Sequence, residues 1–111
     1  MALVKGLNPG RLSKRVTICR YTETEDELGS TVVTLRPLRT VWAEIRPLRG
    51  SEQLEYYKVT MRSTDVTEKD VLAYKGKRFH IEYITDPLEA GYYLELYVTE
   101  DIDRPAREEG L

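Results

Sequence analysis

Alternation between apolar and polar residues is the feature of this 111-residue sequence that most restricts its fold. The clearest example is segment 93–99, where Leu94, Leu96 and Val98 are separated by one glutamate and one tyrosine. A period of two residues is typical of a β-strand with one buried face. We therefore expect a mainly β protein. Similar short segments, several of them rich in β-branched or aromatic residues, occur at 15–21, 31–35, 41–46, 57–62, 71–74 and 77–85.

The sequence has no amphipathic pattern long enough for a standard helix. Six to seven short strands with turn signals between them predict a small antiparallel β-barrel or sandwich, and the strand order stays open. A chain of this length has room for one stable core. We expect a flexible basic N-terminal arm at 1–14, a β-barrel domain at 15–100 and a charged C-terminal tail at 101–111.

The tetrapeptide Arg-Pro-Leu-Arg occurs at 36–39 and again at 46–49. Proline lacks the N–H that a strand donates to its neighbour, so both copies are expected to mark strand termini or edge positions. Segments 31–35 and 41–46, which lie on either side of the first copy, are expected to pair with each other. Segments 71–74 and 77–85 are expected to form a hairpin, because the glycine between them suits a tight turn. One face of its second strand is expected to hold Phe79, Ile81 and Tyr83.

Groups that catalysis or metal binding would require are few. His80 is the single histidine and has no second histidine or cysteine pair with which to form a zinc site. Cys19 is the single cysteine and lacks the sequence context of a nucleophile. The acidic residues between Asp65 and Asp70 do not have calcium-loop spacing, so they are expected to be solvated, with Thr67 and Asp70 closing one turn. We therefore expect no metal, no cofactor and no enzymatic activity.

The charge and hydropathy of the sequence limit the classes of partner that the protein is expected to bind. The 17 basic and 19 acidic residues give a net charge of −2, so no bulk positive field attracts nucleic acid or anionic lipid. No apolar stretch approaches the roughly 20 residues that span a bilayer, and the N-terminus lacks an apolar signal core. One cysteine cannot form an internal disulfide, which favours a reducing compartment. We expect no membrane association and synthesis in the cytoplasm.

Bulky aromatic residues lie at the outward positions of several predicted strands. They are Trp42, Tyr21, Tyr93 and Tyr97. Tyrosine and tryptophan beside arginine are typical of protein interfaces, although the same positions could form the second core layer of a sandwich. The arginines of the two tetrapeptides could bind single-stranded nucleic acid or form salt bridges between subunits, and nearby glutamates favour the second.

Three stretches of the sequence together resemble a known family. They are GRLSKRVTI at 10–18, TVWAEIRPL at 40–48, and YKGKRFHI at 74–81 followed by LEL at 94–96. The chain is similar to the phage head-tail joining proteins, also called head-tail adaptor or head-closure proteins of long-tailed phages and prophages. The resemblance implies a small β-barrel without catalytic residues that forms a ring beneath the portal and adaptor, retains packaged DNA and receives the tail.

In such proteins a long loop after the Arg-Pro-Leu block can project into the channel and close it. The corresponding region here, 49–56, is short, which favours joining of neighbouring rings over plugging of the channel. The expected place is the virion neck, after synthesis in the host bacterial cytoplasm. The expected partners are further copies of the chain, portal or adaptor proteins, tail or tail-terminator proteins, and packaged double-stranded DNA.

We predict two sets of contact residues for this role. The lateral subunit interface is predicted to use Trp42, Arg46, Tyr93 and Tyr97. Contacts to the DNA channel or to the next ring are predicted for Arg36, Arg39, Arg49, Tyr56 and Tyr57. Two other hypotheses remain: a single-strand nucleic-acid-binding barrel, whose affinity would fall steeply with salt, and a small hydrolase with carboxylates brought together by folding.

Overall fold

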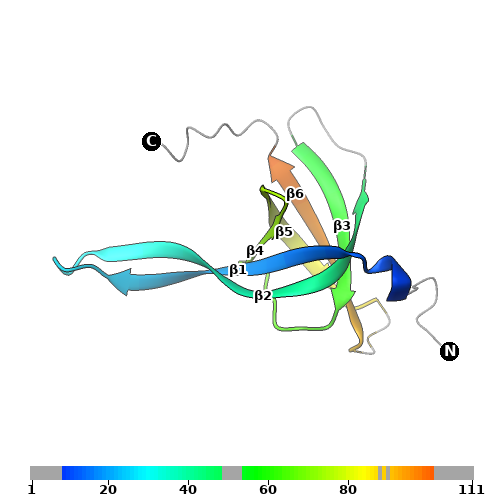
Figure 1. Ribbon diagram of the computed structural model, residues 1–111, viewed down its shortest axis with the longest axis horizontal. Coiled ribbons are helices and arrows are strands. Elements are labelled where there is room, and N and C mark those ends of the chain that lie inside the picture. Colours follow the sequence, from blue (N-terminus) through cyan, green and yellow to red (C-terminus); the bar gives the residue numbers. More distant parts are fainter. Residues whose placement is uncertain (1–8, 49–53, 88, 90, 102–111) are drawn as a thin grey trace.

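The computed structural model describes residues 9–48, 54–87, 89 and 91–101. These residues form one short 3-10 helix, η1 (Pro9–Arg11), and six strands (Figure 1). The strands close a barrel in the order β1-β2-β3-β6-β5-β4, and every neighbouring pair is antiparallel. This confirms the predicted antiparallel β fold and selects the barrel over the sandwich. The strands are β1 (Lys14–Glu25), β2 (Thr31–Pro47), β3 (Leu54–Arg62), β4 (Val71–Tyr74), β5 (Lys77–Thr85) and β6 (Tyr93–Asp101).

The core fills the barrel with the inward side chains of all six strands. Phe79 is its largest fully buried side chain, and the ring of Tyr57 packs edge-on against it with 5.1 Å between centroids. The predicted inward faces of segments 41–46, 57–62 and 93–99 are confirmed. The buried cluster consists of Val16, Ile18, Ala43, Val59, Met61, Leu72, Phe79, Ile81, Leu96 and Val98.

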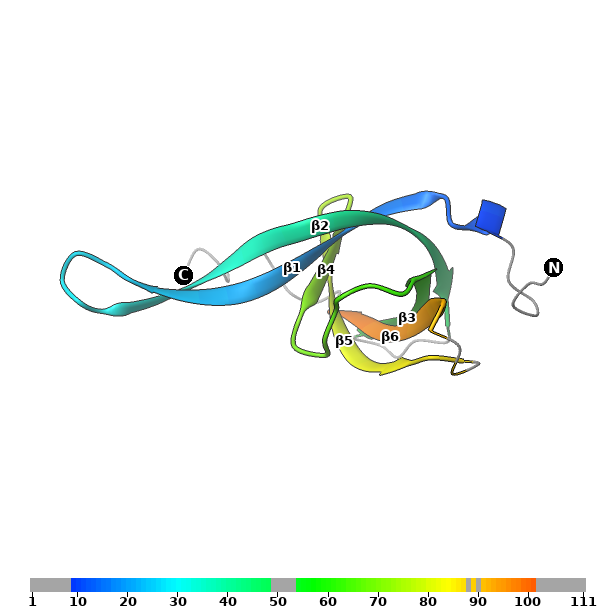
Figure 2. The same cartoon turned by 90° about the horizontal axis from the view of Figure 1, so that it is seen from below.

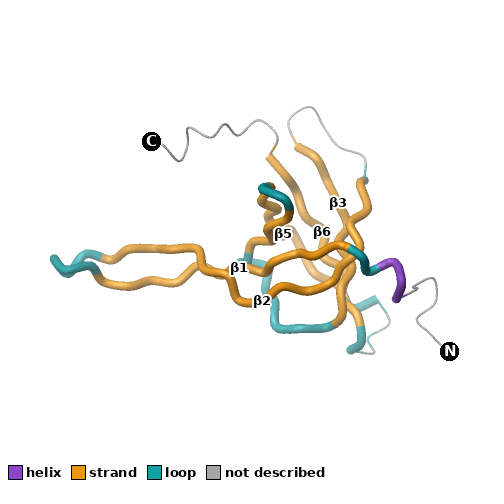
Figure 3. The backbone as a smooth tube through the Cα atoms, viewed as in Figure 1, coloured by secondary structure: helices purple, strands orange, loops and turns teal. Residues whose placement is uncertain are grey.

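β1 and β2 extend well beyond the barrel as a two-stranded ribbon, which we call the projecting hairpin (residues 20–36). It accounts for the elongated shape of the molecule, whose principal extents are 56 × 32 × 20 Å. Figures 1 and 2 show the ribbon leaving one side of the barrel, and Figure 3 shows that strand continues almost to its tip. Its strands keep an antiparallel register as far as the pair Glu25 and Thr31. The prediction of uniformly short strands is therefore wrong for β1 and β2.

The predicted pairing of segments 31–35 and 41–46 with each other is also wrong. Both belong to β2, which runs through Pro37 and pairs with β1. Pro37 lies opposite Cys19, where the β1–β2 register shifts between Ile18 and Cys19. A bulge tolerates a missing N–H, and β3 joins β2 only from Ala43 onward, so Pro37 is at a sheet edge. The edge position was predicted correctly, whereas a strand terminus is found only at Pro47.

A second register shift places Tyr83 outside the barrel. The β5–β6 register shifts between Ile81 and Tyr83, so that one extra residue reverses the alternation. Phe79 and Ile81 are buried as predicted, but Tyr83 is 49% exposed. Ile84 packs against the core in its place. The prediction that Tyr83 shares the buried face is wrong for this reason.

Part of the predicted N-terminal arm has structure. Leu12 is buried, and the Arg11 guanidinium lies 2.9 Å from a carboxylate oxygen of Glu44 on β2. Residues 1–8 and 102–111 lie outside the described residues, so the expected flexibility of the two ends stays a prediction.

A forked ion pair holds β1 beside the start of β4 at the root of the projecting hairpin. Arg20 donates to Asp70 through Nε and Nη2, both at 2.8 Å. Asp70 also accepts the Thr67 N–H at 2.8 Å, and the Asp70 N–H donates to the Thr67 carbonyl, which confirms the predicted turn. Asp70 is only 2% exposed, so its predicted solvated state is wrong, whereas Asp65 is exposed. The expectation failed because Arg20 is distant in sequence.

Replacing Asp70 by asparagine removes the charge but keeps the shape of this contact. We expect Asp70→Asn to lower the free energy of unfolding by about 2 kcal/mol, the scale of a buried charged hydrogen-bond pair. The matched control is Asp65→Asn, whose carboxylate is 62% exposed and 3.4 Å from Arg20. We expect a loss below about 0.5 kcal/mol there. Chemical denaturation measures both, and equal effects would contradict the role of the fork.

The same pair predicts a pH dependence. The hydrogen bond from Arg20, followed by that from Thr67, holds the pKa of Asp70 below its ordinary value of 3.8. A carboxyl with a lowered pKa stabilises the fold above its ordinary pKa, and this stability is lost as the pH falls through the folded-state pKa. The stability difference between the wild type and Asp70→Asn should therefore be constant above about pH 5 and shrink below about pH 4. Denaturation curves at several pH values test this, and a difference that persists unchanged to about pH 3 would contradict it.

Candidate assembly surfaces

The four residues predicted for the lateral interface share the outer face of β2, β3, β5 and β6. Arg46 lies opposite Lys58, and Lys58 lies opposite Tyr97. Tyr93 lies opposite Arg62 on the same pair of strands. Trp42 is 53% exposed on β2. The structure therefore brings these side chains to one sheet face, which we call the paired face because several of its charged side chains form ion pairs with one another.

Two ion-pair groups cover the paired face. Glu44 binds Arg11 at 2.9 Å and Arg46 at 3.2 Å, and Lys58 lies 3.5 Å from Glu95. Thr60 lies between the two glutamates in register and is only 4% exposed, so these long side chains cover it. Arg46 and Lys58 are therefore paired with acidic neighbours on this face, whereas Arg62 takes part in no ion pair among the described residues.

Tyr97 is fixed within this face. Its ring stacks on Tyr83 with 4.5 Å between centroids and an interplanar angle of 13°. Its hydroxyl donates to Glu95 at 3.3 Å, and burial, followed by the Glu95 charge, raises the pKa of Tyr97. A rigid aromatic pair with a positioned hydroxyl is well suited to a protein contact, because little side-chain entropy is lost on binding.

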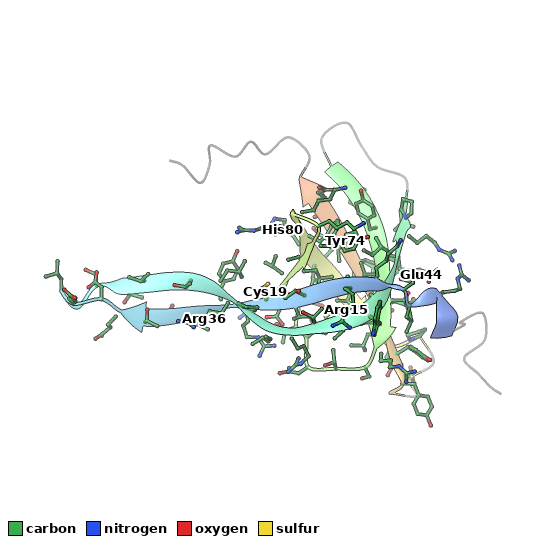
Figure 4. The ribbon with its side chains drawn as sticks, in the orientation of Figure 1. Arg15, Cys19, Arg36, Glu44, Tyr74 and His80 are labelled. Atoms are coloured by element: carbon green, nitrogen blue, oxygen red, sulfur yellow. The ribbon has the colours of Figure 1, made fainter. Side chains whose placement is uncertain are left out.

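Trp42 contacts Arg15, a residue of β1 outside the paired face. The Arg15 guanidinium on β1 lies 4.6 Å from the centroid of its ring, a cation–π contact that leaves half of the indole exposed. Figure 4 shows Arg15 on the barrel portion of β1 and Arg36 along the hairpin. Trp42 thus stands at the border between the paired face and the side of the barrel formed by β1.

The four described residues among the five predicted for channel or inter-ring contacts do not form one cluster. Arg36 lies on the projecting hairpin opposite Arg20, and Arg39 donates to the backbone carbonyl of Asp65 at 2.8 Å. Tyr56 lies opposite Thr99 on the outer face, and Tyr57 packs against the core. Arg49 lies outside the described residues. Of the described arginines proposed for a single-strand nucleic-acid site, Arg36 and Arg39 lie near the root of the projecting hairpin and Arg46 lies on the paired face.

The projecting hairpin is the surface that sequence reasoning missed. Its tip is an Asp26 turn: the carboxylate accepts the N–H groups of Leu28 and Ser30 at 2.9 and 2.8 Å, and Gly29 has φ of 84°. This Asp-to-Gly spacing between threonine- and valine-rich segments was the signal available in the sequence. The acidic residues around it suggested an end to the strand, but both ribbon faces are solvated there, so charge does not oppose strand formation.

Neither a metal site nor a reactive cysteine is found in the described ranges. Those residues contain no group of three or more histidine, cysteine or acidic side chains that could hold a metal. Cys19 is buried, and its burial raises the pKa of the thiol. Within the same residues, no helix has the length and apolar character needed to cross a membrane.

Comparisons with known proteins agree with this architecture. The barrel resembles a chain from the virion of a native gene transfer agent particle, with a TM-score of 0.68 and 16% identity over 80% of this chain and 94% of that chain. It also resembles protein SF1141 from Shigella flexneri 2a, with a TM-score of 0.71 and 20% identity over 88% of this chain and all of that chain. At these identities the likeness shows the fold. No curated protein has a matching sequence.

The family match extends over nearly all of the described barrel. Residues 7–101 match the family described as phage head completion protein. This match includes all six strands and the projecting hairpin, and it confirms the predicted resemblance to phage structural proteins without enzymatic activity. The chain therefore belongs to the phage head completion protein family and is a structural protein of the virion.

Proposed function

We propose that the protein forms a ring at the head–tail connector, the neck of the virion. There it joins the portal or adaptor to the tail or tail terminator and helps to retain the packaged double-stranded DNA. Membership of the head completion family over residues 7–101 is the observation that carries this proposal.

The shape of the subunit supports assembly into a ring. A cyclic ring requires two different surfaces on each subunit, because a head-to-tail contact is repeated around one axis until it closes. This barrel has a paired face on β2, β3, β5 and β6, and a projecting hairpin on another side. Tyr93, Tyr97, Trp42 and Arg46 stay our candidates for the lateral contact, since aromatic residues and arginine dominate protein interfaces.

The connection between β2 and β3 bears on how DNA is retained. The Leu48 N–H donates to the Tyr56 carbonyl at 2.7 Å, so only residues 49–55 lie between the two bonded positions. A connection of this length has a short reach, at most about 3.5 Å per residue out and back. We therefore assign DNA retention to closure of the neck by stacked rings, and not to a long plug from this loop.

Heads produced without this protein provide the direct test. We expect them to package DNA, lose it and fail to attach tails, because the neck remains open. Electron microscopy of purified heads would show empty, tailless particles, and supplying the wild-type chain should restore filled, tailed ones. Filled heads that keep their DNA without the protein would contradict its part in retention.

A double variant tests the proposed lateral contact. We expect Trp42→Ala/Arg46→Glu to fold, since both side chains are exposed, but to join heads to tails at a rate reduced by about tenfold or more, as expected for lost interface anchors. Lys69→Glu, an exposed loop position, is the matched control for a reversed charge. In vitro joining of heads and tails, counted by infectivity, measures both. Normal joining by the double variant would show that these residues lie outside the interface.

A further inference from the structure

The projecting hairpin carries acidic and apolar side chains that, among the described residues, have no ion-pair partner and lie exposed. Between Tyr21 and Leu35 it has four acidic residues and no basic one. None of the ion pairs found among the described residues involves this segment. Isolated two-stranded ribbons are marginal in water, and exposed apolar groups commonly mark a contact site. Its exposed apolar side chains are Leu28 at 89%, Val33 at 58%, Tyr21 at 50% and Val32 at 40%.

Tyr21, Val33 and Leu35 share one face of this ribbon, whereas Val32 lies on the other face, opposite Thr24. Tyr21 lies opposite Leu35, and Glu23 lies opposite Val33, so these four side chains share a face. On this face the acidic residues Glu23 and Glu25 lie on β1, next to Tyr21, and the opposing residues Val33 and Leu35 on β2 are apolar. A partner that fits it must offer positive charge beside an apolar anchor.

The barrel has such a surface on β1, β4 and β5, which we call the basic face: Arg15, Lys75, Arg78 and His80. In register, Arg78 lies opposite Ala73, and Ala73 lies opposite Thr17. Arg15 precedes Thr17 by two residues and Lys75 follows Ala73 by two. Because β1 and β4 are antiparallel, Arg15 and Lys75 lie at the same end of this strand pair. Arg78 also lies close enough to Cys19 to lower its pKa, although burial outweighs this effect.

Small side chains lie between Arg15 and Arg78, and the indole ring of Trp42 lies next to Arg15. The hydroxyls of Thr17 and Thr40 form a hydrogen bond of 3.0 Å. Together with Ala73, these short side chains lie between Arg15 and Arg78. Trp42 rises beside Arg15 with half of its indole exposed. Within the described residues, no ion pair engages Arg15, Lys75 or Arg78, in contrast to Arg46 and Lys58 of the paired face.

We propose that the projecting hairpin of one copy lies on the basic face of a second copy, with its glutamates against Arg15, Lys75 and Arg78 and its apolar side chains on β2 against Trp42. The inference rests on the proposed ring and adds a contact between neighbouring copies to the one proposed for the paired face, with Trp42 taking part in both. The hairpin extends away from its own barrel along the longest axis, so it meets a neighbouring barrel and not its own (Figures 1 and 2). Its charge excludes DNA as its partner, because the phosphate backbone is also negative.

Two charge-reversed variants of the full chain isolate this contact. The hairpin variant is Glu23→Lys/Glu25→Lys/Glu27→Lys, which leaves Asp26 to hold the turn. The face variant is Arg15→Glu/Arg78→Glu. Neither variant can bind itself through the proposed contact, but the intact basic face of the first complements the intact hairpin of the second. Mixing them should therefore produce association that neither shows alone. The reversed hairpin also complements the reversed face, so the complexes can extend beyond a dimer.

Sedimentation velocity and NMR shift mapping at low salt measure this association. We expect the mixture to associate about tenfold or more tightly than either variant alone, and the affinity to fall when ionic strength rises, since exposed charges are screened. A chain carrying both sets of reversals should regain self-association. The control is Lys69→Glu, which reverses one charge at an exposed position outside both the basic face and the paired face. It should associate as the wild type does.

Three results would overturn the proposal. The mixture of the two variants could show no association, or the wild type and both variants could associate equally. The face variant could also lose binding to double-stranded DNA while its self-association stays unchanged. The third would assign the basic face to DNA. Incorporation of each variant into heads separates this inference from the proposed function. A face variant that enters necks and joins tails normally would overturn the hairpin contact while leaving the neck role intact.

Discussion

The short seam between β1 and β4 is the contact on which the rest of this structure depends. The barrel closes through only three residue pairs, Thr17 to Cys19 against Val71 to Ala73. Where this ladder ends, the next two side chains, Arg20 and Asp70, continue it as a forked ion pair. Without the seam, the six strands would form an open sheet with two exposed edges, and the core would lose its enclosure. A buried charged pair at this point adds directional hydrogen bonds where backbone pairing stops.

The same position divides β1 and β2 into a barrel part and a hairpin part. The register shift at Ile18 and Cys19, with Pro37 opposite, increases the local twist and redirects both strands. On the barrel side the strands alternate between core and solvent. On the hairpin side both faces are solvated, and side chains are free to serve contacts. One pair of strands thus supplies both the stability of the subunit and a surface with which to meet others.

Much of the barrel could be predicted from the sequence, because alternation records which side chains face a core. Segment 93–99 and the inward residues Val59 and Met61 follow that rule without interruption. The errors fall where the alternation shifts or where the partner is remote. The bulge before Tyr83 turns its side chain to the outer face of the barrel. Pro37 lies at an edge position within β2 and not at a strand terminus. Asp70 is buried against Arg20, which is fifty positions away in sequence. Neither a bulge nor a long-range ion pair leaves a local signal.

The contact surfaces were predictable only in part. The outward phase of Trp42, Arg46, Tyr93 and Tyr97 followed from the strand pattern, and the structure places them on one face or at its border. The hairpin was not predicted, because a run of acidic residues is more typical of a loop than of a strand. Charge compensation could not be predicted either, since it depends on which strands become neighbours: Glu44 is paired, whereas no described residue forms an ion pair with Arg78.

The acidity of the hairpin also affects what happens before any assembly begins. The outer edges of its two strands present backbone groups that another ribbon could pair with, and such edges are common starting points for aggregation. Glu23, Glu25, Asp26 and Glu27 line one of these strands and its turn, so two free hairpins repel each other at short range. This repulsion opposes edge-to-edge pairing of two hairpins and leaves the ribbon available for a surface of opposite charge.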